Sequence, residues 1–254
     1  MGAWVIGSDE TRVVAHEKVP ERFDRYRLTA GYNAVINQRQ FQVEGLQWPT
    51  DYRYPDETYS DTHTFEAGGE RFELTHAKGE TDDHTWTWVP SRRVLCCGDL
   101  FIWATPNAGN PQKVPRYPRD WSKALREMAA LGAEVMLPGH GLPVVGAERV
   151  RAALEDTAAL LESICDQTFE LMNRGLPLDQ VLAEPVEPPV LQHARMQEVL
   201  VDRRQLIGED SIQKLDDIAI ALHDFSSVRC WRGNSFGSDG KSKPMFASDL
   251  RLLN

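Results

Sequence analysis

The pattern of hydrophobic and polar positions changes along the chain from helical to alternating. Residues 11–16 predict a short strand. Residues 20–41 predict a helix, with Pro20 suited to its first position and Gly31 weakening its middle. Residues 45–61 are rich in Pro, Asp and Tyr, which predicts a long loop.

The alternating pattern starts just after this loop. Residues 63–77 alternate hydrophobic and polar positions around a Gly-Gly turn at 67–70, which predicts a hairpin. Residues 85–89 and 92–97 predict a second pair of strands, joined through a Pro-containing turn. Residues 104–118, with many Pro, Gly and Asn, predict a loop.

Helical spacing returns in the second half of the chain. Residues 120–132 carry an apolar stripe, and we expect Asp120 to cap this helix and Gly132 to end it. Residues 133–137 predict a short buried strand, and residues 145–175 predict the longest helix of the chain. This mixture of strands and helices predicts the α/β class.

The organisation into domains follows from these elements. We expect one domain over residues 1–181, a Pro-rich linker over 182–190, and a helical C-terminal region with a flexible tail over 191–254. Within the last region, residues 194–208 and 209–223 predict two amphipathic helices.

Composition and charge narrow the function only slightly. The 254 residues carry a formal net charge of −10, which argues against a protein that binds nucleic acid. The sequence has neither an apolar run that could span a membrane nor a recognisable signal peptide, so we expect a cytoplasmic protein without membrane association. The four cysteines lack metal-ligand spacing and are expected to be reduced.

Three candidate metal ligands fall next to predicted strands. His84 precedes strand 85–89, Asp99 follows strand 92–97, and His140 follows strand 133–137. Loops at the edge of a sheet can bring such side chains into one cleft, and imidazole and carboxylate groups suit Zn²⁺, Mn²⁺ or Fe²⁺. Each residue also has a structural interpretation, as a surface histidine, a turn aspartate and a histidine of a tight turn.

The sequence around these residues resembles the second half of the metallo-β-lactamase superfamily of hydrolases. That family has a Gly-x-Thr-x-x-His segment, then Gly-Asp, then Gly-His. Here the three segments are Gly-Glu-Thr-Asp-Asp-His at 79–84, Gly-Asp-Leu-Phe at 98–101 and Pro-Gly-His-Gly at 138–141. Their surroundings are most similar to an alkylsulfatase-like branch.

The resemblance implies a fold, a cofactor and a reaction. The fold is a partial αββα sandwich with additional C-terminal helices. His84 would bind a first metal, Asp99 would bridge, and His140 would bind a second, so the cofactor is one or two zinc ions, or manganese or iron. A metal-activated hydroxide would hydrolyse a small-molecule ester, lactone, β-lactam or sulfate ester.

The family's leading His-x-His-x-Asp-His motif does not occur in this sequence. The opening Met1-Gly2-Ala3-Trp4 resembles the residues that follow that motif, so we expect a domain that is incomplete at its N-terminus. An alternative follows from this expectation. The chain is then a weakly active or inactive remnant that acts through self-association, as a homo-oligomer.

Supporting roles fall to residues around the three ligands. We expect Asp82 or Asp83 to hydrogen-bond to a metal-binding histidine and so to orient its ring. Asn110 and Lys113, with Asn107 and Arg116 of the same loop, are candidates for binding an anionic substrate group or are solvated surface residues. His76 lies on an apolar strand face. A substitute metal site formed by His76 with Asp83, His84, Asp99 and His140 is conceivable, but a hydrogen-bonded histidine of the core is the favoured interpretation.

Overall fold

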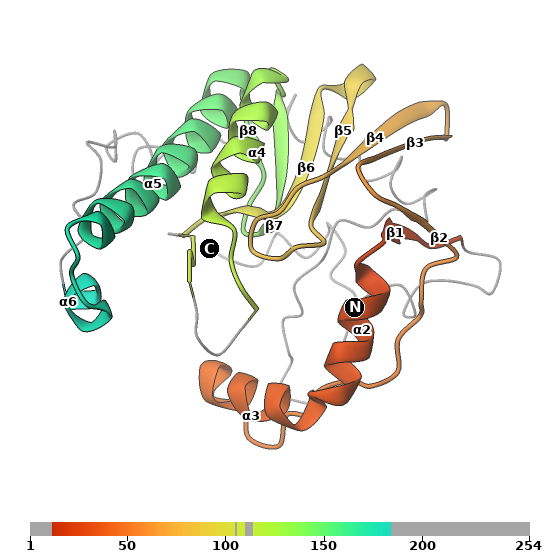
Figure 1. The fold of residues 1–254 in the computed structure, drawn as a ribbon. Helices are drawn as coiled ribbons and strands as arrows, with labels where there is room; N and C mark the ends of the chain where they lie inside the picture. The colour runs from red at the N-terminus through yellow and green to blue at the C-terminus, as the bar shows by residue number, and fades with distance from the viewer. Residues whose placement is uncertain (1–11, 105, 110–113, 184–254) are drawn as a thin grey trace, which may run out of the picture.

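The computed structural model describes residues 12–104, 106–109 and 114–183, and its centre is a six-stranded sheet (Figure 1). The strands are β3 (Thr62–Ala67), β4 (Glu70–His76), β5 (Thr85–Val89), β6 (Val94–Ile102), β7 (Val135–His140) and β8 (Val144–Val145). They lie in the sheet in their order along the chain, as expected for strands joined mainly by short turns. A 3-10 turn, η1 (Pro90–Arg92), joins β5 to β6.

One pair in this sheet is parallel, and it positions the candidate site. β6 and β7 run in the same direction, whereas the other neighbours are antiparallel. A parallel pair needs a crossover connection, and helix α4 (Pro118–Ala130) supplies it. The register between β6 and β7 shifts on both sides of Gly98, whose φ of 53° is a conformation that glycine adopts readily.

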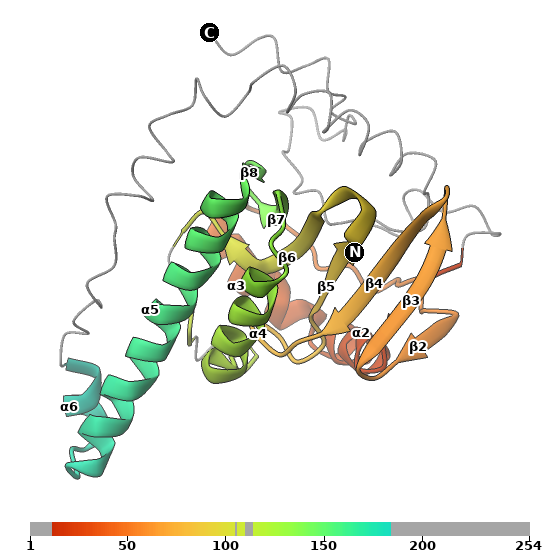
Figure 2. The ribbon, with the colours of Figure 1, turned by 90° about the horizontal axis from the view of Figure 1, so that it is seen from above.

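Two helices cover one face of the sheet. α4 packs against the long helix α5 (Ala147–Asn173), and Figure 2 shows both on the same side of the strands. α4 buries residues three and four apart, because that spacing places them on one side of a helix. Trp121, Leu125 and Met128 of α4 and Leu154 and Leu161 of α5 are fully buried in the resulting core.

The opposite face of the sheet has a second, smaller core. Phe72, Val94, Cys96 and Val135 belong to it, whereas Cys97, the neighbour of Cys96, belongs to the core under the helices. This arrangement confirms that adjacent strand residues face opposite sides of the sheet. Cys96, Cys97 and Cys165 are buried thiols that form no disulfide within the described part of the chain, as predicted for these three.

A small N-terminal part lies beside the main sheet. β1 (Val14–His16) pairs in parallel with β2 (Glu57–Tyr59), and two helices, α2 (Val19–Leu28) and α3 (Ala30–Phe41), lie between these strands in the sequence. The prediction of a single helix over 20–41 was wrong, because the helical path breaks at Thr29. The predicted loop 45–61 contains β2, which sequence inspection missed because its partner lies about forty residues earlier.

Other boundaries also differ from the prediction. Asp120 does not cap α4, since the helix begins at Pro118 and Asp120 lies in its first turn, where its charge suits the helix dipole. Asp99 lies inside β6 rather than after it, and His140 is the last residue of β7.

The C-terminal part of the described chain is a short helix, α6 (Leu178–Ala183). Most of the predicted linker 182–190 and all of the predicted region 191–254 lie outside the described residues. Over the part of the chain that the structure describes, every helix is too short or too polar to cross a membrane.

Leu125 tests the core between α4 and α5. Its side chain is 0% exposed, whereas Leu28 of α2 is 87% exposed. We expect Leu125→Ala to lower the free energy of unfolding by about 2–5 kcal/mol through lost burial and a cavity, and the matched Leu28→Ala change to lower it by less than about 0.5 kcal/mol. Urea unfolding followed by circular dichroism measures both, and equal losses would contradict this packing.

Candidate metal centre

Asp99 of β6 and His140, the last residue of β7, meet across the parallel pair of strands. Asp99 Oδ1 lies 2.6 Å from His140 Nδ1, although 41 positions separate the two residues in the sequence. Both side chains reach solvent, so an ion or a substrate has access to them. The structure therefore brings together two of the three residues that the sequence predicted as metal ligands.

Two glycines leave the space in which these groups lie. A Cβ atom on Gly139 would collide with Asp99 Oδ1, and one on Gly98 would lie 2.8 Å from His84 Nε2. Each glycine thus precedes a candidate ligand in the sequence and also makes room for another candidate in space. The Gly-Asp and Gly-His pairs are required by this packing.

His84 lies against Gly98, the residue before Asp99. Its Nε2 atom is 3.1 Å from the carbonyl oxygen of Cys97. Burial lowers the pKa of His84, and the Cys97 carbonyl and Asp99 oppose this shift only in part. Because a carbonyl oxygen only accepts, the Nε2–H of His84 donates to the backbone of β6, and the role of His84 as a metal ligand stays a prediction.

Glu80 is a member of the cluster that sequence inspection missed. Burial raises the pKa of its carboxyl, and a nearby Asp99, with which it shares a hydrogen bond, raises it further, while Arg116 and His140 oppose the shift. Arg116 Nη2 donates to Glu80 Oε1 over 2.7 Å. Glu80, Asp99 and His140 therefore form one electrostatically coupled group.

Asp82 and Asp83 have a different partner from the one predicted. Arg22 of α2 donates to both carboxylates, and Thr81 Oγ1 donates to Asp83 over 2.6 Å. Burial alone would raise the pKa of Asp83, but Arg22 and Thr81 outweigh it and hold the pKa below its ordinary value. Among the described residues, no hydrogen bond joins either carboxylate to a histidine ring.

The predicted substrate-binding residues cannot be placed here. Asn110 and Lys113 lie outside the described residues. Arg116, from the same loop, is enclosed and bound to Glu80 by its side chain and also donates to the Glu80 backbone carbonyl. It is therefore neither a solvated surface base nor free to bind a substrate anion.

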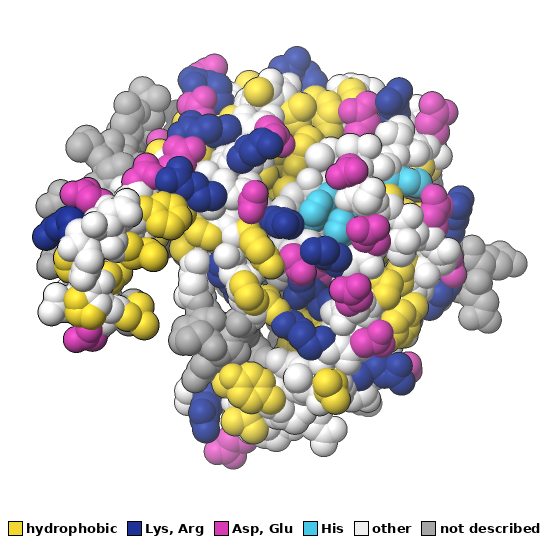
Figure 3. Space-filling view, viewed as in Figure 1, with side chains coloured by type: hydrophobic (Ala, Val, Ile, Leu, Met, Phe, Trp, Pro, Cys, Tyr) yellow, Lys and Arg dark blue, Asp and Glu magenta, His cyan; other side chains and the backbone are white. Residues whose placement is uncertain are grey.

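The donor set suits a divalent cation in chemistry but falls short in arrangement. Two carboxylates and an imidazole are ligands that zinc, manganese and iron accept. Within the described ranges, however, no three His, Cys, Asp or Glu side chains are placed around one point as an ion requires. On the face of the molecule drawn in Figure 3, histidine side chains reach the surface with acidic and basic side chains around them.

A second pair of histidines lies outside this group. The rings of His16 and His76 stack with centroids 3.8 Å apart, and His76 Nε2 is 2.9 Å from the carbonyl oxygen of Asp82. Burial, and then the neighbouring His76, lower the pKa of His16. His76 is thus a hydrogen-bonded structural histidine, in agreement with the favoured interpretation of the sequence.

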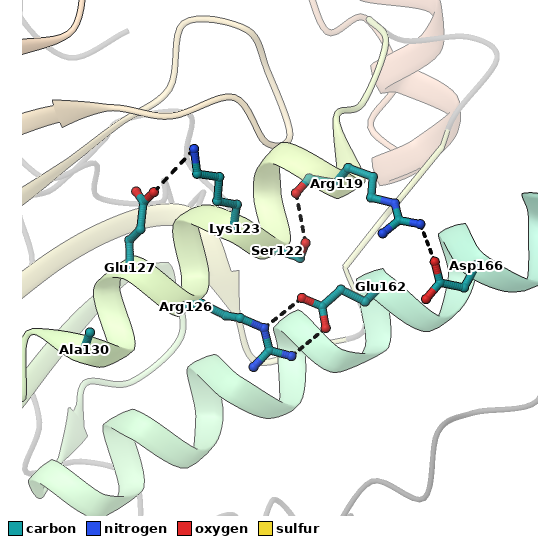
Figure 4. A pocket seen from close by; sticks show the side chains of 8 residues that line it. All are labelled: Arg119, Ser122, Lys123, Arg126, Glu127, Ala130, Glu162 and Asp166. Carbon is teal, nitrogen blue, oxygen red and sulfur yellow. Dashed lines mark hydrogen bonds and ion pairs between the residues drawn. The ribbon is translucent and has the colours of Figure 1, made fainter.

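A groove along α4 and α5 is not part of the candidate centre. Its charged side chains are engaged with one another: Arg126 with Glu162, Arg119 with Asp166, and Lys123 with Glu127 (Figure 4). The residues that line it come from these two helices and include none of the candidate ligands.

Comparison with known proteins shows the family to which the chain belongs. The sequence profile described as "Metallo-beta-lactamase superfamily" matches residues 13–140, about half of the chain. The chain belongs to the metallo-beta-lactamase superfamily. Members of this superfamily typically depend on zinc, and the matched segment contains Glu80, His84, Asp99 and His140.

Within the superfamily, the chain is similar to alkylsulfatases. It is 32% identical over 139 residues to a linear primary-alkylsulfatase from a Pseudomonas species, a match that covers 54% of this chain and 26% of that enzyme. The stereoselective inverting sec-alkylsulfatase Pisa1 from Pseudomonas sp. shares its fold with a TM-score of 0.62 and 17% identity. A double mutant of the same sulfatase gives a TM-score of 0.62 and 18% identity.

These comparisons cover only part of each relative. The similarity to Pisa1 covers 89% of this chain but 45% of that protein, and the similarity to its double mutant covers 84% and 43%. The chain thus spans less than half of the sulfatases whose fold it shares. At this level of identity the likeness shows the fold, and it confirms the predicted metallo-β-lactamase-like α/β architecture.

Gly139 tests the close packing at the centre. We expect Gly139→Ala to displace the Asp99 carboxylate and to lower the free energy of unfolding by about 1–3 kcal/mol, the usual cost of overpacking. Gly109→Ala is the matched control, because nothing lies within 4 Å of a Cβ atom added there. Urea unfolding compares the two, and a Gly139→Ala protein as stable as the control would contradict the geometry.

The lowered pKa of His16 predicts that the protein loses stability in mild acid. The lowered value means that, below the ordinary histidine value of about 6.5, the unfolded chain binds a proton that the folded chain does not. Stability therefore falls from that pH down to the folded pKa, by at most about 1.4 kcal/mol per pH unit. We expect His16→Gln to flatten this slope in urea unfolding between pH 7 and 5, and an unchanged slope contradicts it.

Proposed function

We propose that this chain takes part in metal-dependent hydrolysis of alkyl sulfate esters. The observation that carries the proposal is the contact between Asp99 and His140, which lie in the segment matched by the superfamily and come from two neighbouring parallel strands, Asp99 within β6 and His140 at the end of β7. Side chains that are open to solvent and supported by a rigid sheet are suited to catalysis.

The substrate class rests on the sequence similarity to a sulfatase. The sequence alone left esters, lactones, β-lactams and sulfate esters as alternatives. The match at 32% identity is to an enzyme named for linear primary alkyl sulfates. This similarity favours a sulfate ester with a linear alkyl chain over the other three classes.

Asp99, His140 and Glu80 are the residues that we expect to hold an ion. Such an ion supplies Lewis acidity, which polarises an ester and lowers the pKa of water. In this arrangement Asp99 Oδ1 accepts from His140 Nδ1, so the two residues can ligate one ion only after this direct contact opens. Asn110 and Lys113 stay candidates for binding the sulfate group.

The alternative is an inactive protein that associates with itself. Apolar side chains on α3 and α5 favour this reading, since Tyr32, Phe41, Phe169 and Met172 are all about half exposed or more. Exposed apolar surface of this kind promotes association between copies. The two readings differ in metal content, in turnover and in mass in solution.

Metal analysis and turnover of hexyl sulfate test the proposal together. We expect bound zinc or manganese by elemental analysis, sulfate release that stops with chelator, and a loss of roughly a hundredfold or more in kcat/KM for Asp99→Ala and His140→Ala. Nitrophenyl acetate, a lactone and a β-lactam are the comparison substrates, and we expect slower turnover of each.

Two positions away from the centre provide matched controls. Asp166→Ala and His63→Ala remove the same side-chain types away from the centre and should retain turnover. A protein that carries no metal and hydrolyses no substrate with or without added ion contradicts the proposal. If it also sediments as an oligomer, self-association becomes the better account.

A further inference from the structure

The segment between β4 and β5 concentrates negative charge at the candidate centre. Residues 79–84 contain Glu80, Asp82 and Asp83, and the nearby Asp99 adds a negative charge that raises the pKa of Glu80. Like charges this close repel one another, and a free loop would turn them outward to water. Something must therefore hold this loop in place.

Arg22 holds one end of the loop from α2. Its guanidinium donates to Asp82 and Asp83, and its side chain is only 10% exposed. Lys18 adds a more distant contact, 3.6 Å from Asp82. Because the guanidinium presents several donors in one plane, a single side chain can fix two consecutive carboxylates.

Arg116 holds the other end from the segment before α4. Its side chain is 5% exposed, and it donates both to the Glu80 carboxylate and to the Glu80 backbone carbonyl. The next residue strengthens this attachment, because Tyr117 N donates to the carbonyl of Gly79 over 3.0 Å. Hydrogen bonds therefore hold both the backbone and the side chains of this loop.

We propose that Arg22 and Arg116 are positioning residues that clamp the loop 79–84 from two sides and aim Glu80 at Asp99 and His140. The consequence for metal binding rests on the proposed function, whereas the clamp itself is a property of the folded chain. The two arginines come from α2 and from the segment before α4, so the clamp also ties these parts to the sheet.

The burial of Arg116 supports a role beyond an ordinary ion pair. Its Nε atom is buried without a hydrogen-bond partner, an arrangement that costs stability. A surface ion pair such as that of Arg126 with Glu162 leaves no such group, and it contributes little to any fold. The enclosed position of Arg116 is explained by the need to reach both the carboxylate and the backbone of Glu80.

Hydrogen exchange in the metal-free protein tests the clamp directly. We expect Arg116→Gln and Arg22→Gln to speed amide exchange in residues 78–84 roughly tenfold, since each loses charge-assisted hydrogen bonds to the loop. Exchange in the β3–β4 hairpin should not change. Arg126→Gln is the matched control, because it breaks an exposed arginine–carboxylate pair on α4. Unchanged exchange over 78–84 in both variants overturns the proposal.

Zinc affinity then tests the consequence for the centre. In competition with a chromogenic chelator, both variants should bind zinc roughly tenfold to a hundredfold more weakly than the unmodified chain, and Arg126→Gln should bind equally. Equal zinc affinity in all four proteins overturns the positioning role. If the unmodified chain binds no zinc, the metal centre of the proposed function fails, while hydrogen exchange still decides the clamp.

Conservative changes guard against a variant that does not fold. Arg116→Lys keeps the charge but cannot reach the carboxylate and the carbonyl with a rigid planar group, so we expect an intermediate exchange rate. Asp83→Asn leaves Arg22 in place and removes one of its carboxylate partners, and it should loosen the same segment. If both changes leave the loop as protected as in the unmodified chain, the clamp is refuted.

Discussion

The parallel pairing of β6 with β7 is the constraint on which the candidate centre depends. It sets Gly98 opposite Pro138 and Ile102 opposite His140, so that Asp99 comes to lie against Gly139. A parallel pair cannot form through a tight turn, and the α4 crossover is held to the sheet by the core that it shares with α5. The contact between Asp99 and His140 is therefore a product of the whole sheet and its helical layer.

The sequence predicted those elements whose formation depends on residues close together in the chain. The alternation over 63–77 with its Gly-Gly turn matches the hairpin of β3 and β4, and the apolar stripe from 120 to 132 matches α4 within two residues. β2 was missed because a three-residue strand in a polar loop exists only through its pairing with β1. The break at Thr29 was not predicted, although Gly31, two residues later, was expected to weaken the helix at this point.

The candidate centre was predictable only where a glycine precedes the ligand. Gly-Asp and Gly-His after apolar strands indicated Asp99 and His140, and the structure explains the glycines by close approach. Glu80 gave no such signal, because an acidic residue in a polar loop resembles any solvated one. Glu80 differs from a solvated residue because Arg116, 36 positions away, donates a hydrogen bond to its carboxylate. Arg22 likewise donates to the carboxylates of Asp82 and Asp83, about 60 positions away in the sequence. Partners so distant in sequence are visible only in the folded chain.

The identity of these donors also bears on the metal. A typical zinc site in proteins relies on histidine or cysteine, whereas oxygen ligands suit harder ions such as manganese. In the proposed centre, Glu80 and Asp99 would contribute oxygen and His140 nitrogen, while the Nε2 atom of His84 is engaged by the backbone. Burial is the main cause of the raised pKa of Glu80, and the neighbouring Asp99 raises it further, while Arg116 and His140 oppose the shift. A divalent cation beside these two carboxylates would offset their repulsion, which is the physical basis of the metal centre that we propose.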